Sequence, residues 1–206
     1  MYSRRLFLLA LTALPALAAS PAPALAAATD AGAFVKSLGD QVINTLKNTS
    51  LSQTQREQTF RQLFDQGFDV PEISRFALGR FWRQATPQQR TQYQSLFEEF
   101  IVRTYAARFS GYSGQTFSVT GSQPGQNGEV TVRSSINRPD GPPVRVDWQV
   151  RKEGSQYKIV DVVVEGVSMV ITQRQEFASV IQNGGGNVAT LLTQLRQKID
   201  QMKAGS

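Results

Sequence analysis

The side chains that this sequence offers for chemistry are carboxylates, hydroxyls and basic groups, because it contains no cysteine and no histidine. Thiol nucleophiles, disulfides, Cys/His zinc sites, Ser-His-Asp triads and imidazole acid–base catalysis are therefore excluded. Most of the common types of catalytic site are thereby excluded. We expect no metal ion and no cofactor.

Two carboxylates, Asp161 and Glu165, lie four residues apart in an apolar segment. On an extended strand they would point to the same side at a separation of about 13 Å. That distance is too long for two carboxylates that flank one scissile bond. A lone buried Asp161 could still act as a general base in a cone-shaped fold of the NTF2-like kind. We keep this as the weaker alternative and expect the chain not to be an enzyme.

Three arginines, Arg75, Arg80 and Arg83, surround the aromatic pair Phe81-Trp82. A guanidinium group binds phosphate through two parallel hydrogen bonds. These side chains are therefore candidates for contact with a phosphate at the mouth of a cavity. The alternative is a solvated helix edge, or ion pairs with Glu72.

The charge balance is mildly basic, with 22 lysines and arginines against 16 acidic residues and a net charge of +6. The basic residues are not concentrated in one stretch of the sequence. Nucleic-acid binders more often gather them in a patch, a groove or a basic helix. We therefore expect no nucleic-acid partner. A mild excess suits loose attraction to anionic membrane surfaces or acidic partners.

Residues 1–26 have the pattern of an export signal peptide, with Arg4 and Arg5 ahead of an apolar run that small residues follow. The apolar run is roughly 14 residues long, short of the about 20 that cross a bilayer as a helix. Ala24-Leu25-Ala26 fits a cleavage signal, which predicts a mature chain of residues 27–206 that forms one domain.

The route of export stays open. Residues 3–8 resemble the twin-arginine signal, which directs export of a folded protein. Two arginines are also an ordinary feature of the positive segment of a signal for the general secretory route.

Apolar residues recur at helical spacing in the first half of the mature chain. Capping boxes at Ser52–Gln55 and Thr86–Gln89 mark two helix starts. The spacing predicts helices over 30–48, 52–66, 70–83 and 87–109. The last of these has the clearest buried stripe, formed by Tyr93, Leu96, Phe97, Phe100, Ile101 and Tyr105.

After residue 114 the period changes to two, which indicates strands. We expect strands over 115–120, 128–137, 143–151 and 156–165, and then helices over 168–181 and 187–203 that a run of three glycines separates. The fold class is therefore α+β: a four-stranded, curved antiparallel sheet whose apolar face a helical layer covers.

Three stretches of the sequence carry a family resemblance. They are RFALGRFWRQATPQQR at 75–90, YKIVDVVVEGVSMV at 157–170 and QRQEF at 173–177. In this order and spacing they resemble the MlaC family of periplasmic phospholipid-binding proteins, also called the toluene-tolerance or Ttg2 family. The match covers essentially the whole mature chain.

The resemblance implies a periplasmic carrier that shuttles phospholipid between two membranes. Its implied partners are an outer-membrane lipoprotein complex and an inner-membrane ABC transporter that bears a ring of MCE domains. We expect such a carrier to act as a monomer. Residues 108–114 and Phe117 resemble the hopanoid-associated HpnM branch instead, while residues 165–169 resemble MlaC proper. A hopanoid-related ligand therefore remains the alternative.

An apolar sheet face is ordinary core in most proteins, but the resemblance favours a cavity for acyl chains between the sheet and the helical layer. Such a cavity needs small β-branched residues opposite a helical stripe, and an adaptable methionine suits variable chains. The residues predicted to bind lipid are Phe97, Ile101, Tyr105, Val130, Val132, Val146, Trp148, Val150, Val164, Val167 and Met169. The three arginines named above would contact the head group.

Overall fold

The computed structural model describes residues 22–107 and 111–204. Most of the predicted signal peptide, residues 1–21, lies outside them, as do residues 108–109 of the predicted fourth helix. The helices are α1 Ala22–Lys47, α2 Gln53–Gly67, α3 Val70–Leu78, α4 Pro87–Ala106, α5 Met169–Asn183 and α6 Val188–Ala204, with short 3-10 turns at Gly79–Trp82 and Gln126–Gly128.

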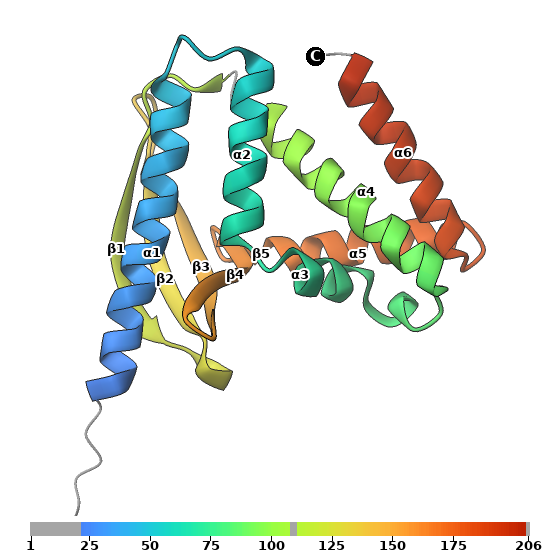
Figure 1. The fold of residues 1–206 in the computed structure, drawn as a ribbon, viewed down its shortest axis with the longest axis horizontal. Helices are drawn as coiled ribbons and strands as arrows, with labels where there is room; N and C mark the ends of the chain where they lie inside the picture. The colour runs from blue at the N-terminus through green and yellow to red at the C-terminus, as the bar shows by residue number, and fades with distance from the viewer. Residues whose placement is uncertain (1–21, 108–110, 205–206) are drawn as a thin grey trace, which may run out of the picture.

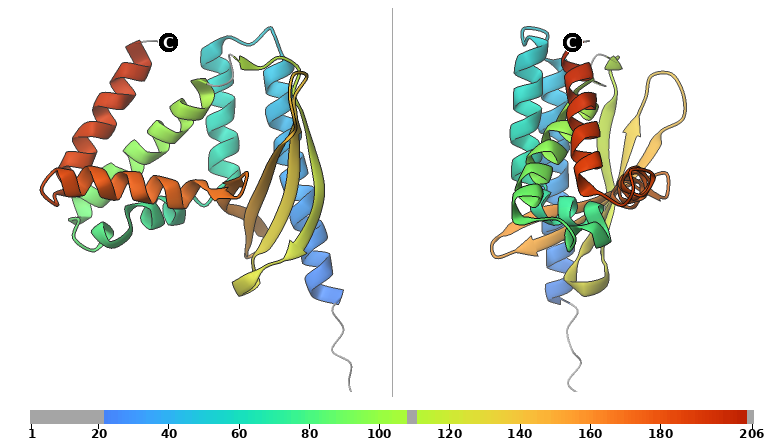
Figure 2. Two further views of the ribbon diagram at one scale, coloured as in Figure 1. Left: turned by 180° about the vertical axis from the view of Figure 1, so that it is seen from behind. Right: turned by 90° about the vertical axis from the view of Figure 1, so that its right-hand side faces the viewer.

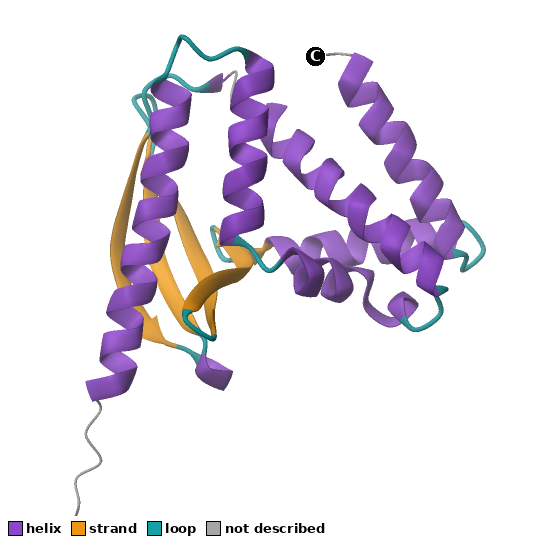
Figure 3. Cartoon of the chain, in the orientation of Figure 1, coloured by secondary structure: helices purple, strands orange, loops and turns teal. Residues whose placement is uncertain are grey.

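The strands form one antiparallel sheet in the order β1-β2-β3-β4-β5. Their bounds are β1 Thr116–Pro124, β2 Val130–Asn137, β3 Val144–Glu153, β4 Gln156–Val164 and β5 Val167–Ser168. The α+β class with a curved, open sheet is confirmed: α1 lies along the sheet, while α4, α5 and α6 extend to one side of it (Figure 3).

The predicted number of four strands is wrong, because β5 adds a fifth. Glu165 and Gly166 both have positive φ, 49° and 83°, and this tight turn folds Val167 back to pair with Val164. A strand of two residues shows no alternation, so the period of the sequence could not reveal it.

Capping side chains mark the starts of most of the helices. Ser52 and Gln55 cap α2 reciprocally, and Thr86 and Gln89 do the same for α4. The predicted helix over 70–83 is interrupted, because Gly79 adopts a φ of 59° and ends α3. A residue in this left-handed region cannot continue an α-helix. The chain passes instead into a 3-10 turn.

The molecule has two hydrophobic cores rather than one. In the first, α1 lies along the sheet and buries Val35 against Val132, Val150 and Ile159 (Figures 1 and 2). The contact is close: a Cβ atom on Gly39 of α1 would lie 2.3 Å from Cδ1 of Phe117 in β1. This half of the molecule is therefore a sheet with one helix packed on its apolar face.

The second core consists of helices alone. Phe177 of α5 meets Tyr93 and Phe97 of α4 edge to face, with ring centroids 6.0 and 6.2 Å apart, and leucines of α6 complete the packing. The hydroxyl of Tyr93 donates to the carbonyl of Ser74 at 2.9 Å, and burial raises its pKa. None of the helices in residues 22–107 and 111–204 is long and apolar enough to cross a membrane.

Candidate functional site

A cavity of about 830 Å³ lies between the two cores. One wall is the sheet and the opposite wall is the helical group, while α1 and α2 close the sides. The α1 and α2 side chains that line it are almost all aliphatic or aromatic: Val35, Leu38, Val42, Ile43, Leu46, Phe60, Leu63 and Phe64. A lining of this kind excludes water and suits an apolar ligand.

Seven of the eleven predicted lipid-contacting residues line this cavity. Their elements explain why they meet there: Phe97, Ile101 and Tyr105 recur at four-residue steps on one side of α4, and β4 leads into α5 at one end of the cavity. These residues are Phe97, Ile101, Tyr105, Val146, Trp148, Val164 and Met169. The indole N–H of Trp148 donates to Ser134 Oγ at 2.8 Å, which satisfies its polar atom and leaves an apolar ring surface.

The other four predicted residues lie outside the lining. Val130, Val132 and Val150 are at most 5% exposed, because α1 covers their part of the sheet face and fills it. Val167 is exposed instead, since the turn at Glu165 and Gly166 carries it to the edge of the sheet in β5. Alternation alone identified the apolar face, but it did not show which part of that face a helix would cover.

The three predicted head-group arginines also lie outside the lining. Arg75, Arg80 and Arg83 are exposed, and the guanidinium of Arg80 stacks on Phe81 with its Cζ 4.9 Å from the ring centroid. No ion pair joins them to Glu72 in the part of the chain that the structure describes. The arginine in the lining is Arg138, whose guanidinium donates twice to the carbonyl of Pro142.

The residues of α1 and α2 that line the cavity were not among the site residues predicted from the sequence. Their signal was present, because Val35, Leu38, Val42 and Leu46 recur at steps of three and four residues. The pattern predicts a buried face on α1. It does not distinguish a face packed on the sheet from one that borders a cavity.

Asp161 lines the cavity, and hydrogen bonds hold its carboxylate. It accepts the Ser168 hydroxyl at 2.6 Å and the backbone N–H groups of Val162 and Val170 at 2.8 and 3.2 Å. This arrangement ties β4 to the first turn of α5, where a carboxylate is also favoured by the helix dipole. Glu165 points elsewhere and accepts the backbone N–H of Arg145. The two carboxylates therefore form no catalytic pair.

In the described residues, no group of three or more carboxylates is placed to hold a metal ion. The site therefore combines a large apolar cavity with one hydrogen-bonded carboxylate inside it and one exposed arginine beside it. Such an arrangement can hold a hydrocarbon ligand.

The sequence profile of the MlaC protein family matches residues 36–197. The chain belongs to the MlaC family. A solved phospholipid-binding protein from Ralstonia solanacearum, in complex with a phospholipid, has the same fold at a TM-score of 0.73. It is 32% identical in sequence, and the match covers 84% of this chain and 98% of that one.

Two curated relatives in the MlaC family match shorter stretches. The intermembrane phospholipid transport system binding protein MlaC of Haemophilus influenzae is 25% identical over 128 residues, 60% of this chain and 59% of that protein. The toluene tolerance protein ttg2D of Pseudomonas putida is 23% identical over 109 residues, 53% of this chain and 51% of that protein. The alignments thus span somewhat more than half the length of each relative.

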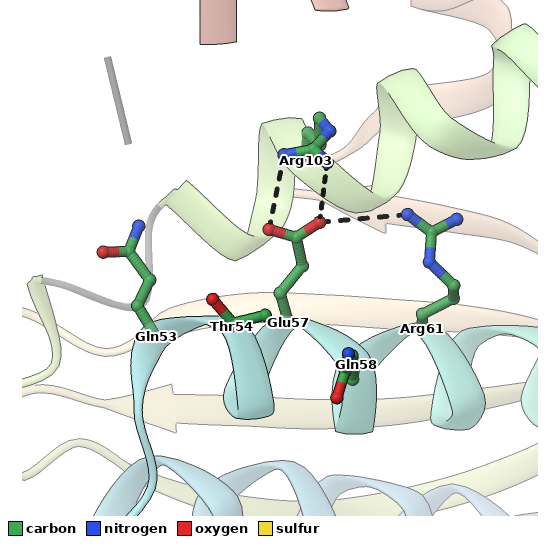
Figure 4. Close-up of a pocket in the computed structure, with 6 residues that line it drawn as sticks. All are labelled: Gln53, Thr54, Glu57, Gln58, Arg61 and Arg103. Atoms are coloured by element: carbon green, nitrogen blue, oxygen red, sulfur yellow. Dashed lines mark hydrogen bonds and ion pairs between the residues drawn. The ribbon is translucent and has the colours of Figure 1, made fainter. Parts of the chain in front are cut away.

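Beside the apolar cavity, this member of the MlaC family has a smaller polar pocket of about 390 Å³ between α2 and α4. Arg103 of α4 reaches Glu57 of α2 there, with Nη2 and Oε1 3.4 Å apart (Figure 4). Arg61 of α2 pairs with Glu98 and Glu99 of α4. The two arginines of this pocket are paired with glutamates of both helices, and these ion pairs join α2 to α4.

Proposed function

We propose that this chain is a periplasmic carrier that binds a phospholipid by its acyl chains and shuttles it between the outer and inner membranes. The observation that carries the proposal is the apolar cavity of about 830 Å³, whose lining has far more hydrocarbon than polar groups. The phospholipid in the related Ralstonia solanacearum structure supports the same ligand class.

The cavity size indicates how much hydrocarbon it can hold. A methylene group is about as large as a water molecule, whose share of liquid volume is about 30 Å³. A cavity of about 830 Å³ therefore accommodates on the order of 25 methylene groups. That is enough for two acyl chains of medium length, or for most of two longer ones, and we propose a single two-chain lipid as the ligand.

We propose that the chain performs no catalysis. Both oxygens of Asp161, the one carboxylate in the cavity lining, already accept hydrogen bonds that position α5. The bonds from Ser168 and Val170 join β4 to the first turn of α5, a task that needs no substrate. The role that we assign to Asp161 is therefore structural.

Export and cleavage near Ala26 fit the way that α1 packs. Ala28 and Ala31 are the first buried residues of α1 among those described, and the Tyr157 hydroxyl donates to the carbonyl of Ala27 at 3.4 Å. A mature chain that begins at Ala27 keeps all of these contacts. We therefore retain residues 27–206 as the proposed mature domain.

The proposed partners are those of an intermembrane transport system. The Haemophilus influenzae relative is named as the binding protein of an intermembrane phospholipid transport system. By analogy we propose that this chain, as a monomer, receives and delivers lipid at an outer-membrane lipoprotein complex and an inner-membrane ABC transporter with MCE domains.

Lipid extraction tests the proposal. The protein is purified from the periplasm without detergent, extracted with organic solvent and analysed by mass spectrometry. A carrier yields about one diacyl phospholipid per protein. A stoichiometric hopanoid would favour the HpnM-like alternative, and an extract with no stoichiometric lipid would refute the carrier.

A further inference from the structure

Three of the four large hydrophobic side chains that are markedly exposed in the described residues belong to α3, β5 and α5. Phe76 of α3 is 43% exposed, Val167 of β5 is 54% exposed and Ile171 of α5 is 49% exposed. Helices α3 and α5 pack side by side, at the end of the molecule opposite the turn between α1 and α2 (Figures 1 and 2). The exposed hydrophobic residues are thus concentrated on one part of the surface.

Arginines accompany these apolar side chains. The guanidinium of Arg174 in α5 stacks on Phe76, with its Cζ 5.0 Å from the ring centroid, and it also borders Gly79. Arg75 and Arg80 are exposed on α3 and the following 3-10 turn. We call the surface of Phe76, Val167, Ile171, Arg75, Arg80 and Arg174 the α3–α5 face.

The positive charge of the α3–α5 face is not neutralised by ion pairs. None of its arginines lies within salt-bridge distance of a carboxylate in the residues that the structure describes. The neighbouring carboxylates include Glu72 on α3, Glu176 on α5 and the exposed Glu165 in the turn before β5. Glu176 accepts a hydrogen bond from Gln173, and Glu165 accepts the backbone N–H of Arg145. The ion-paired arginines between α2 and α4 provide a contrast, because each of them meets at least two glutamates.

The same two helices border the lipid cavity with their inner sides. Ile73 and Ala77 of α3, and Met169, Val170 and Gln173 of α5, line the cavity. The outer side of these helices is therefore separated from the cavity by the thickness of a single helix layer. A binding partner that contacts the outer side of α3 and α5 would therefore lie close to the cavity.

We propose that the α3–α5 face docks on the surface of an anionic phospholipid bilayer. Basic side chains are attracted to anionic lipids, and neighbouring exposed apolar side chains enter the boundary between head groups and acyl chains. The stacked arginine covers apolar surface with its flat group while keeping its charge available. This inference adds a docking site to the proposed carrier. Its evidence is the exposed side chains of the α3–α5 face, whereas the proposed function rests on the cavity.

Binding to vesicles tests the docking site. Purified mature protein is sedimented with vesicles of phosphatidylcholine alone, or of phosphatidylcholine mixed with anionic phosphatidylglycerol, in low and high salt. Binding is expected only to the anionic vesicles and to weaken in high salt, because screening shortens the reach of surface charge.

The variant R75Q/R174Q is expected to bind anionic vesicles roughly 30-fold more weakly, since each basic residue near such a surface is worth about fivefold in affinity. The matched control K36Q/R133Q makes the same change of net charge on α1 and β2, in the other half of the molecule, and is expected to bind within about twofold of the wild type.

The variant I171S removes an exposed apolar group and is expected to weaken binding about threefold to tenfold. Lipid content after extraction is measured for every variant, so that a failure to bind lipid in the cavity is distinguished from a failure to dock.

Two results would overturn the proposal. Equal losses in R75Q/R174Q and K36Q/R133Q would show that only net charge attracts the protein to vesicles. Absence of wild-type binding to anionic vesicles, at low salt and with normal lipid content, would show that the α3–α5 face does not dock on an anionic bilayer.

Discussion

At the scale of single residues, the direction of a side chain decides whether it can touch a ligand. Val163 and Val164 are neighbours on β4 with the same chemistry, yet only Val164 lines the cavity. Val163 pairs with Asp147 and Ser168 and points to the other face of the sheet. The pair therefore offers a matched test of the cavity.

The substitution Val164→Glu is expected to abolish lipid binding. It places a carboxylate in an apolar cavity without a partner, where desolvation costs several kcal/mol or forces protonation. The lipid extracted per folded protein should fall at least about tenfold. Val163→Glu carries the same charge on the opposite face and should keep its lipid. Full occupancy in a folded Val164→Glu protein would place the binding site elsewhere.

The substitution Asp161→Asn is expected to reduce stability without changing the transfer mechanism. An amide nitrogen replaces an oxygen that accepts a hydrogen bond at the start of α5, so the free energy of unfolding should fall by about 1–3 kcal/mol. Urea denaturation measures this loss, and lipid transfer between two vesicle populations measures activity. Loss of a catalytic base would instead slow turnover roughly 10²-fold or more in a protein that remained folded.

At the scale of elements, the connection between α2 and α4 depends on charged residues. Burial alone would raise the pKa of Glu99, but hydrogen bonds from Arg103 and Arg61 outweigh it and lower that pKa below its ordinary value of 4.5. Glu99 therefore stays ionised, and its carboxylate accepts hydrogen bonds from both Arg61 and Arg103. These contacts join the two helices beside the wall that Phe60 and Tyr105 contribute to the cavity.

The pH dependence of stability should report this network. Since the folded state lowers the pKa of Glu99, its contribution is complete above the ordinary value of 4.5 and is lost as the pH falls through the lower folded value. The free energy of unfolding of the wild type should therefore exceed that of E99Q at pH 7, and this difference should shrink toward pH 3.

Urea denaturation at several pH values measures the difference in the free energy of unfolding between wild type and E99Q. The variant E153Q is the control, because the pKa of Glu153 is shifted in the opposite direction. The neighbouring carboxylate of Asp69 raises the pKa of Glu153, so the folded state favours its protonated form. The substitution E153Q should therefore cause no loss of stability at neutral pH. A difference between wild type and E99Q that stays constant with pH would contradict the role assigned to Glu99.

At the scale of the whole molecule, the cavity exists because two cores form separately and do not close on each other. The sheet packs on α1, and the helical group packs on itself, while Phe68 at the end of α2 touches both cores. The space between them is lined by buried members of both cores, such as Val35 and Phe97, and by partly buried side chains that lie between the cores. An apolar ligand in that space would complete the packing.

Affinity should therefore depend on acyl-chain length. Shortening both chains of a lipid by four carbons removes about eight CH₂ groups, worth up to ~6 kcal/mol if all of them are buried. Binding should weaken by orders of magnitude. Competition with a fluorescent lipid, using long-chain and short-chain lipids of one head group, measures the change. Equal affinity for both lengths would contradict a cavity that binds lipids by their tails.

The sequence by itself determined the fold class, the capped helix starts and the alternating strands. These features depend on contacts within a few residues, such as the capping boxes of α2 and α4 and the period-two pattern of β3. It also identified the helical stripe and some of the aromatic and β-branched residues that line the cavity from α4 and the sheet, but it missed others, such as Val144 and Val162. The family resemblance on residues 75–90 and 157–170 supplied the expectation of a cavity, and the family is confirmed.

Only the tertiary structure decided which apolar residues border the cavity. Val132 and Val146 alternate in the same way along their strands, but α1 covers Val132 and leaves Val146 at the cavity wall. Arg80 and Arg138 are both exposed arginines, yet the path of the chain places only Arg138 in the lining. The reason is physical: periodicity records that a side chain is withdrawn from water, whereas the identity of what covers it depends on segments far apart in the sequence.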